Sequence, residues 1–207
     1  MKPYWSYLKS LLRHKWFVLL AGLKVGGVPL WRLIVHDMSK FSRFEFRQYA
    51  VNFHGQESPV DADQVSLDFA YAWLHHENNN PHHWGYWIPR SGKYAGKPLP
   101  MPHTYVREMV ADWMGAGRAY QGHWDMTKWL NENLYRMNEH WHETTKVRVG
   151  FLLDQQGYRA VYEEFLFGLT EETYYECGAC FTEYDAPGRC PECGYTIFEQ
   201  KRPRVGG

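Results

Sequence analysis

The sequence predicts an all-α domain with a small cysteine-containing module at its C-terminus. Apolar residues recur at helical spacings over most of residues 3–166. All four cysteines lie near the C-terminus, in two Cys-x-x-Cys pairs. A chain of 207 residues can bury a core without disulfides. We therefore expect a helical domain over residues 1–168 and a separate module over residues 171–200.

The first helix is predicted over residues 3–25. It carries an apolar stripe, at spacings of three and four residues, that includes one histidine: Tyr7, Leu11, His14, Val18 and Ala21. Gly26-Gly27 ends this helix, and Pro29 suits the first turn of the next one. The inner face of the first helix therefore presents a histidine among apolar side chains.

The second helix is expected to end near Lys40, with His36 and Asp37 in its last turn. Shortly after it, Ser42-Arg43-Phe44-Glu45 has the form of a capping box, which predicts a third helix from about Arg43.

Three further helical stretches are predicted. One runs from a cap at Asp61 to Asp63 as far as Glu77, one follows a cap at Thr104, and a third spans residues 125–166 with a break near Gly157. The loop over residues 78–103 is rich in proline and contains bulky aromatic residues. Long loops within compact domains are usually functional, and we expect a short hairpin that folds back onto the helices.

Composition excludes several classes of protein. The formal net charge is zero, which argues against a nonspecific binder of nucleic acid or of a membrane surface. The apolar run "WFVLLAGL" is too short to span a bilayer, and no small-residue cleavage site follows it. We expect a cytoplasmic protein with no membrane partner; the oligomeric state is not predicted.

The cysteines predict a structural zinc site. Cys177 and Cys180 form one pair, Cys190 and Cys193 the other, with nine residues between the pairs. This spacing is typical of a zinc ribbon, in which four thiolates surround one tetrahedral ion. Gly194 allows the positive φ of a metal-binding turn. The alternatives are two disulfides, or iron held by the same four thiolates.

The loop between the two cysteine pairs argues against binding of nucleic acid by the ribbon. Its sequence, "FTEYDAPGR", contains two acidic residues and one arginine. A structural role or a contact with a protein partner is the favoured interpretation.

Histidines and aspartates of the helical part form a second candidate metal site. In chain order they are His14, His36, Asp37 and Asp112, with His75-His76 and His82-His83 between them. Imidazole and carboxylate together suit Mn, Fe, Co, Ni or Zn as divalent ions. The alternative is structural: a core histidine on the first helix, a histidine at the end of the second, and Asp112 paired with Arg107 or Arg118. Glu108, one turn from Asp112, is the substitute ligand.

This pattern resembles the HD superfamily of metal-dependent phosphohydrolases, which are all-helical and carry ligands in the order H…HD…D. His14, His36, Asp37 and Asp112 match those four ligands; "HDMSK" is similar to the family's His-Asp-x-x-Lys turn and "VADWM" to its Ala-Asp motif. The stretch "HHENNNPHHW" resembles the histidine-bearing segment of dinuclear members. The arrangement is also similar to an uncharacterised family of phage and bacterial proteins. No Gly-Tyr-Pro follows the histidines, which argues against a cyclic-dinucleotide phosphodiesterase.

The resemblance implies a divalent-metal-dependent phosphohydrolase that acts on a small phosphate ester, with a nucleotide as the expected substrate. Asp37 would orient the attacking water and Lys40 would offset charge on the phosphoryl oxygens. Helical spacing favours His76 over His75 as a ligand, and we choose His83 over His82. Arg90 and Lys93 are expected to contact the substrate from the loop. The rival is a non-catalytic, metal-stabilised binding protein whose ribbon contacts a protein or nucleic-acid partner.

Overall fold

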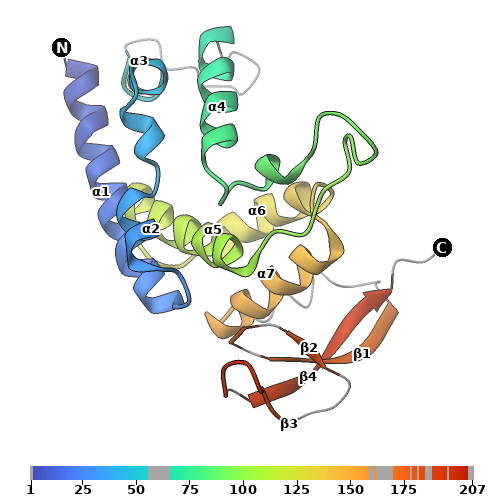
Figure 1. Cartoon of the computed structure of the whole chain (residues 1–207). Coiled ribbons are helices and arrows are strands. Elements are labelled where there is room, and N and C mark those ends of the chain that lie inside the picture. The colour runs from blue at the N-terminus through green and yellow to red at the C-terminus, as the bar shows by residue number, and fades with distance from the viewer. Residues whose placement is uncertain are drawn as a thin grey trace.

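The structure is a computed structural model that describes residues 2–55, 66–158, 161, 170–177, 179–180, 182–184, 188–194 and 196–204 (Figure 1). Most of the described chain is helical, as predicted. Seven α-helices lie in these ranges: α1 (Lys2–Val25), α2 (Leu30–Val35), α3 (Arg43–His54), α4 (Leu67–Asn79), α5 (His103–Ala116), α6 (Thr127–Asn138) and α7 (Glu143–Gln155).

Helix α1 is the longest helix and organises the others. Figure 1 shows α3 beside its first half, α4 next to α3, and α5 crossing it further along. The predicted stripe is buried over its whole length, from Tyr7 through His14 to Ala21. Gly115 on α5 faces the backbone of Val18, which brings α1 and α5 into close contact. This contact lies about one turn from His14 on α1 and from Asp112 on α5.

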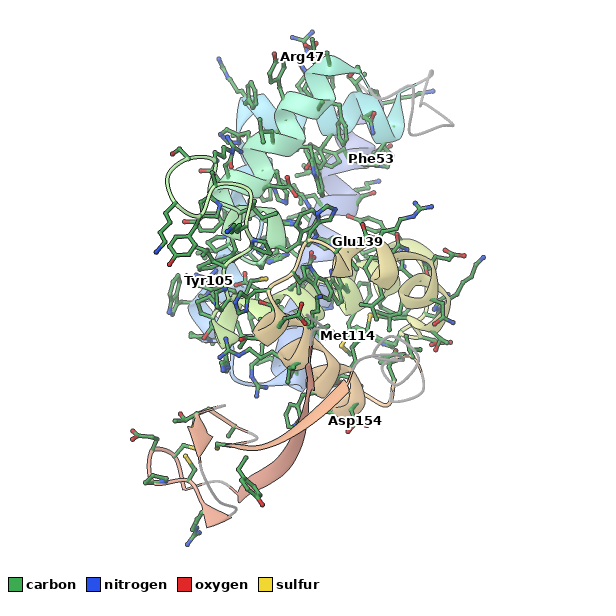
Figure 2. All side chains as sticks on the ribbon, turned by 90° about the vertical axis from the view of Figure 1, so that its right-hand side faces the viewer. Arg47, Phe53, Tyr105, Met114, Glu139 and Asp154 are labelled. Atoms are coloured by element: carbon green, nitrogen blue, oxygen red, sulfur yellow. The ribbon has the colours of Figure 1, made fainter. Side chains whose placement is uncertain are left out.

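Two hydrophobic clusters form the core of the helical part. The smaller one joins α1, α3 and α4: Tyr7, Leu11, Tyr49, Ala50, Phe69 and Ala72. The larger one joins the second half of α1 to α5, α6 and α7 and includes Met114, which is labelled in Figure 2. Along α1, His14 lies between the residues of the two clusters. Polar side chains therefore meet between two apolar regions.

Helix α2 is shorter than predicted. It ends at Val35, and His36 and Asp37 lie in the turn before a 3₁₀ turn, η1 (Met38–Phe41). Placing them in the last helical turn was therefore wrong. Asp37 adopts the left-handed conformation with φ 57°, the one positive φ of a non-glycine residue in the described ranges. Aspartate tolerates this conformation better than most residues, and the reversal lets the two neighbouring side chains converge.

The helix starts differ in detail from the predictions. Ser42 caps α3 as expected, with its hydroxyl accepting from the Glu45 N–H. Ser66 caps α4, and the predicted caps at Asp61 to Asp63 lie outside the described residues. Helix α5 begins at His103 after Pro102, so Thr104 lies inside the helix and does not cap it. It continues into a π-helical turn, η4 (Gly117–Gln121).

The loop between α4 and α5 folds back but contains no strand. A 3₁₀ turn, η3 (Trp84–Trp87), follows the histidines. The Leu99 N–H donates to the Trp87 carbonyl oxygen and the Gly96 N–H to that of Pro89. Tyr105 packs on Trp87, with ring centroids 5.4 Å apart, just below this loop in Figure 2. The hairpin prediction is therefore right about the reversal and wrong about extended structure.

The described part of residues 125–166 contains one more break than predicted. Helices α6 and α7 are separated at residues 139–142, and α7 ends just before Gly157, which has φ 91°. The predicted domain boundary near residue 168 falls outside the described residues. None of the described helices is long and apolar enough to cross a membrane.

The C-terminal module is a four-stranded antiparallel sheet. Its strands are β1 (Thr170–Cys177), β2 (Glu183–Tyr184), β3 (Gly188–Arg189) and β4 (Thr196–Arg204), in the order β2-β1-β4-β3. Strand β1 pairs with β4 so that Cys177 lies opposite Ile197. In both figures the sheet lies at the end of the molecule next to α7, away from α3 and α4.

Candidate metal centre

Two groups of potential ligands meet between α1, α4 and α5. One contains His14, His36, Asp37 and Asp112, and the ligand atoms of this group all lie within 4.8 Å of one another. The other contains Asp37, His76, His82 and His83, under the same limit. Asp37 belongs to both groups.

The first group has the spacing expected around one ion. Its His14 Nε2 atom lies 3.2 Å from Asp37 Oδ2 and 3.1 Å from Asp112 Oδ1. His36 Nε2 lies 3.5 and 3.3 Å from the same two oxygens. Ligands about 2.1 Å from an ion are separated by roughly 3.0 Å at right angles and roughly 3.4 Å at tetrahedral angles. These four side chains therefore fit the edges of a coordination sphere.

The second group uses the other oxygen of Asp37. Oδ1 lies 3.4 Å from both His76 Nε2 and His82 Nε2, and His83 Nε2 lies 2.9 Å from His76 Nε2. Asp37 Oδ1 and His82 Nε2 are fully buried and have no hydrogen-bond partner. Orphaned buried polar atoms are costly, and a shared ion would satisfy both. The residues present thus fit two ions joined by the carboxylate of Asp37.

Two buried glutamates orient the imidazoles. Glu108 Oε1 lies 3.2 Å from His36 Nδ1 and 3.5 Å from His82 Nδ1. Glu45 Oε2 lies 2.9 Å from His76 Nδ1. A histidine whose Nδ1–H donates to a carboxylate offers the lone pair of Nε2 to a metal. Although His36, His82 and Glu108 also lie close enough to bind an ion, these contacts assign Glu108 an orienting role.

Charge pairing holds the first group together. Burial works to lower the pKa of His14 and that of His36, but Asp37 and Asp112 raise both above the ordinary value. Burial works to raise the pKa of the two aspartates, yet the histidines hold each well below its usual range. The carboxylates are therefore ionised, as ligands must be.

The second group is electrostatically different. Burial is the main cause that lowers the pKa of His76, and it lowers that of His83 still further with help from His82. Neutral imidazole is the form that binds a metal. Burial thus leaves these histidines ready to act as ligands at neutral pH.

Further contacts hold the His36-Asp37 turn. The Lys15 ammonium group on α1 donates to the carbonyl oxygens of Ile34 and His36. Lys40 Nζ lies 2.6 Å from Asp37 Oδ2, and this carboxylate raises the pKa of Lys40 although burial opposes it. Lys40 is therefore a cation fixed beside both groups.

A cavity of about 560 Å³ borders the centre. His14, His83 and Asp112 form part of its wall, so both groups reach it, and Lys40 lies there too. The remaining wall is largely aromatic: Tyr7, Tyr49, Phe53 (labelled in Figure 2), Trp73 and Tyr120. Cavities of this size commonly bind small ligands.

Several predicted site residues are placed differently by the structure. His82 and His83 both join the second group, so a choice between them was unnecessary. His76 is buried whereas His75 is partly exposed and contacts Glu45 from the outside. Arg90, in the exposed loop, donates to the Asn78 side chain in the last turn of α4, and the Lys93 ammonium group lies over the Tyr94 ring. Neither Arg90 nor Lys93 lines the cavity.

The sequence interpretation missed Glu45 and Arg32. The sequence gives Glu45 only the role of a capping-box residue, but the Ser42 N–H donates to the Ser39 carbonyl oxygen and the Glu45 carboxylate contacts His75 and His76. Arg32 holds Glu108, with Nη2 2.7 Å from Oε2. An acidic residue in an otherwise basic and apolar stretch was the available signal for Glu45. Nothing in the sequence marked Arg32.

The four cysteines form a separate cluster, as predicted. All four sulfur atoms lie within 4.8 Å of one another, and those of Cys177 and Cys193 are 3.4 Å apart, too far for a disulfide. Burial works to raise the pKa of Cys177, but the N–H groups of Cys180 and Ala179 lower it below its ordinary value. Gly194 has φ 73° and donates to the Cys190 carbonyl oxygen. The cluster is compatible with a zinc ribbon.

Comparison with known proteins places the helical part in one family. Residues 3–155 match DUF5662, which is described as a family of unknown function. The chain belongs to the DUF5662 family. No curated protein and no solved structure matches it. The DUF5662 region contains every residue of both ligand groups and ends before the cysteines.

Proposed function

We propose that this protein is a divalent-metal-dependent phosphohydrolase of the HD type, acting on a small phosphate ester such as a nucleotide. One observation carries the proposal: two ligand groups share the Asp37 carboxylate and border a cavity that contains Lys40. The order of ligands along the chain, H…HD…H…H…D, supports the same proposal.

The ligand chemistry supports two ions of the Mn, Fe, Co, Ni or Zn type. His14, His36 and Asp112 would hold the first, His76, His82 and His83 the second, and Asp37 both. Mixed imidazole and carboxylate ligands suit these metals better than Mg²⁺ or Ca²⁺. Such ions, when bound, supply Lewis acidity and lower the pKa of water for attack on phosphorus.

The chain's own residues have distinct tasks in this proposal. Lys40 offsets negative charge on the phosphoryl oxygens, because its ammonium group is held at the cavity wall beside Asp37. Hydrolysis forms a bond from water oxygen to phosphorus and breaks the ester bond, so that the departing alcohol leaves with a proton.

The aromatic wall supports a nucleotide as substrate. The hydroxyl groups of Tyr7 and Tyr49 are buried without a hydrogen-bond partner, and burial raises the pKa of both phenols. Both remain protonated, so they can donate to ribose or phosphate oxygens. Phe53 and Trp73 offer flat surfaces on which a base can stack.

The test is phosphate release by the full-length protein loaded with each metal in turn. The panel contains nucleoside monophosphates, a phosphodiester and a nonspecific aryl phosphate. We expect turnover that His36→Ala and Asp37→Asn both abolish. His36→Ala should lose the first helical ion and Asp37→Asn both helical ions, while the zinc of the cysteine cluster is retained. Asp68→Asn on α4, which changes an exposed aspartate, is the matched control and retains turnover and metal content. Metal-loaded protein without turnover on any substrate would leave only the binding-protein rival.

A further inference from the structure

Helix α1 has a second apolar face that the described fold leaves uncovered. Trp5, Leu12, Trp16 and Leu23 follow one another at spacings of seven, four and seven residues. The helical period places them on one side, opposite the buried stripe that carries His14. Their exposed fractions are 60%, 52%, 57% and 60%. A helix needs one apolar face to join a core, so this outer face requires another explanation.

The outer face is also basic. Lys2, Lys9, Arg13 and Lys24 are exposed on α1, and the helix contains no acidic residue. Lys9 Nζ lies 5.2 Å above the ring of Trp5, so a cation and an indole ring are in contact on this surface. Asp37 and Glu45 are the acidic residues of the described range 2–55, and both are fully buried in the metal centre.

The neutral total charge therefore conceals a local asymmetry. Acidic residues on the molecular surface, such as Asp68, Glu132 and Asp154, all come later in the chain. Residues 2–55 place lysine and arginine on the surface but no exposed acidic residue. A protein with zero net charge can thus present a strongly positive face to a partner.

We propose that the outer face of α1 docks on an anionic lipid bilayer, with the helix lying in the plane of the membrane surface. Indole rings and aliphatic side chains suit the boundary between headgroups and acyl chains, and flanking lysines and arginines suit anionic headgroups. Because α1 is not apolar enough to cross a membrane, its contact is superficial. The inner face keeps His14 in the metal centre while the outer face binds lipid.

Charge disfavours a second copy of the chain as the occupant. In a symmetric dimer formed by this face, the basic surface that contains Lys9 and Arg13 would meet the same basic surface of the other copy. No acidic residue on α1 could pair with them, so like charges would oppose association. An anionic bilayer supplies the missing negative charge.

The test is co-sedimentation of the full-length protein with vesicles. One set contains phosphatidylcholine alone and the other about 30 mol% phosphatidylserine. We expect binding to the anionic set that is at least about tenfold stronger and falls steeply as NaCl is raised from about 0.05 M to about 0.5 M. Trp5→Ser/Trp16→Ser and Lys9→Glu/Arg13→Glu should each weaken binding at least about tenfold.

Matched controls test whether the loss of vesicle binding is specific to the outer face of α1 or follows from any change of an exposed aromatic or basic residue. Tyr71→Ser changes an exposed aromatic residue on α4, and Lys93→Glu/Lys97→Glu makes the same charge change in the loop after α4. Both should bind vesicles like the wild type, and all variants should keep their helical circular dichroism. Equal binding by the Trp5→Ser/Trp16→Ser variant, or no binding to anionic vesicles, overturns the proposal. A wild-type dimer that Trp16→Ser dissociates, without vesicle binding, assigns the face to a second copy instead.

Discussion

The backbone of Val18 on α1 lies against Gly115 on α5. A Cβ atom added at Gly115 would come within 2.6 Å of the Val18 backbone nitrogen and 2.7 Å of its Cα atom. Because a backbone cannot move aside as a flexible side chain can, any larger residue must push the two helices apart. These helices carry His14 and Asp112, whose ligand atoms are 3.1 Å apart.

We expect Gly115→Ala to lower the free energy of unfolding by about 1–3 kcal/mol and to weaken metal binding at the first group. Gly117→Ala is the control, because its added Cβ would meet only the His123 carbonyl oxygen at 3.8 Å. Denaturant titration and metal analysis of both variants check this. Equal stability of the two variants would show that α1 and α5 tolerate a wider separation.

Because the Asp37 carboxylate belongs to both ligand groups, its substitution should remove more metal than substitution of a residue in one group. We expect about three equivalents of metal per chain, two in the helical part and one in the ribbon. His14→Ala should lose one helical ion, His83→Ala the other, and Asp37→Asn both. Elemental analysis after dialysis measures this, with His123→Ala, an exposed histidine, as the control. Retention of one helical ion by Asp37→Asn would contradict a bridging role.

Glu45→Gln should weaken the second ion selectively. Hydrogen bonds from His76 and His75 hold the pKa of Glu45 below its ordinary value although burial opposes them. A neutral glutamine keeps the shape but removes the negative charge that polarises His76. We expect a loss of about 10–100-fold in affinity at one of the two helical sites. Chelator competition measures it against Glu132→Gln, and equal losses at both sites would assign Glu45 a general structural role.

His103 predicts a dependence of stability on pH. Burial is the main cause that lowers its pKa to about 4, with Arg148 and Arg107 contributing. The unfolded chain, with a pKa near 6.5, binds more protons between these values, so stability is lost as the pH falls from about 6.5 to about 4. His103→Gln should reduce this loss of stability by on the order of 1 kcal/mol. The figure is smaller than the pKa shift alone would give, because His103 is partly exposed and solvent screens its charge.

The pH test compares unfolding of wild type and His103→Gln at several pH values. The metal ligands also make the free energy of unfolding depend on pH. They do so equally in both proteins, so their effect cancels when the two free energies are subtracted. His123→Gln, on the surface, should follow the wild type. If the free energies of unfolding of wild type and His103→Gln differ by the same amount at every pH, His103 is not the cause of the pH dependence.

The cysteine cluster is expected to be independent of the helical centre. Cys190→Ser should remove one equivalent of zinc and leave the two helical ions in place, because the DUF5662 region ends before the cysteines. Metal analysis together with thiol titration measures this. Loss of all three ions in Cys190→Ser would show that the module stabilises the helical part.

The helices themselves were largely predictable. The α1 stripe, the Gly26-Gly27 stop and the Ser42 cap are local patterns, and each appears where the sequence predicts it. The cysteine cluster was predictable for the same reason, since each Cys-x-x-Cys pair holds its two sulfur atoms close together through local sequence spacing.

The geometry of the helical centre depends on contacts that are distant in sequence. His36 and Glu108 are separated by 72 positions, and no local pattern reveals that one orients the other. The left-handed turn at Asp37, rather than a helix end, lets one carboxylate face two groups of histidines.

The sequence by itself determined which residue types would meet: an inner helical stripe with one histidine, an His-Asp pair, later histidines and a final aspartate. Only the tertiary structure decided that Asp37 is shared, that His82 and His83 both take part, and that Glu45 and Glu108 orient the imidazoles. The physical reason is that helix periodicity is set by the local backbone. The distance between side chains on different helices is set by packing, here by the contact of Gly115 with Val18.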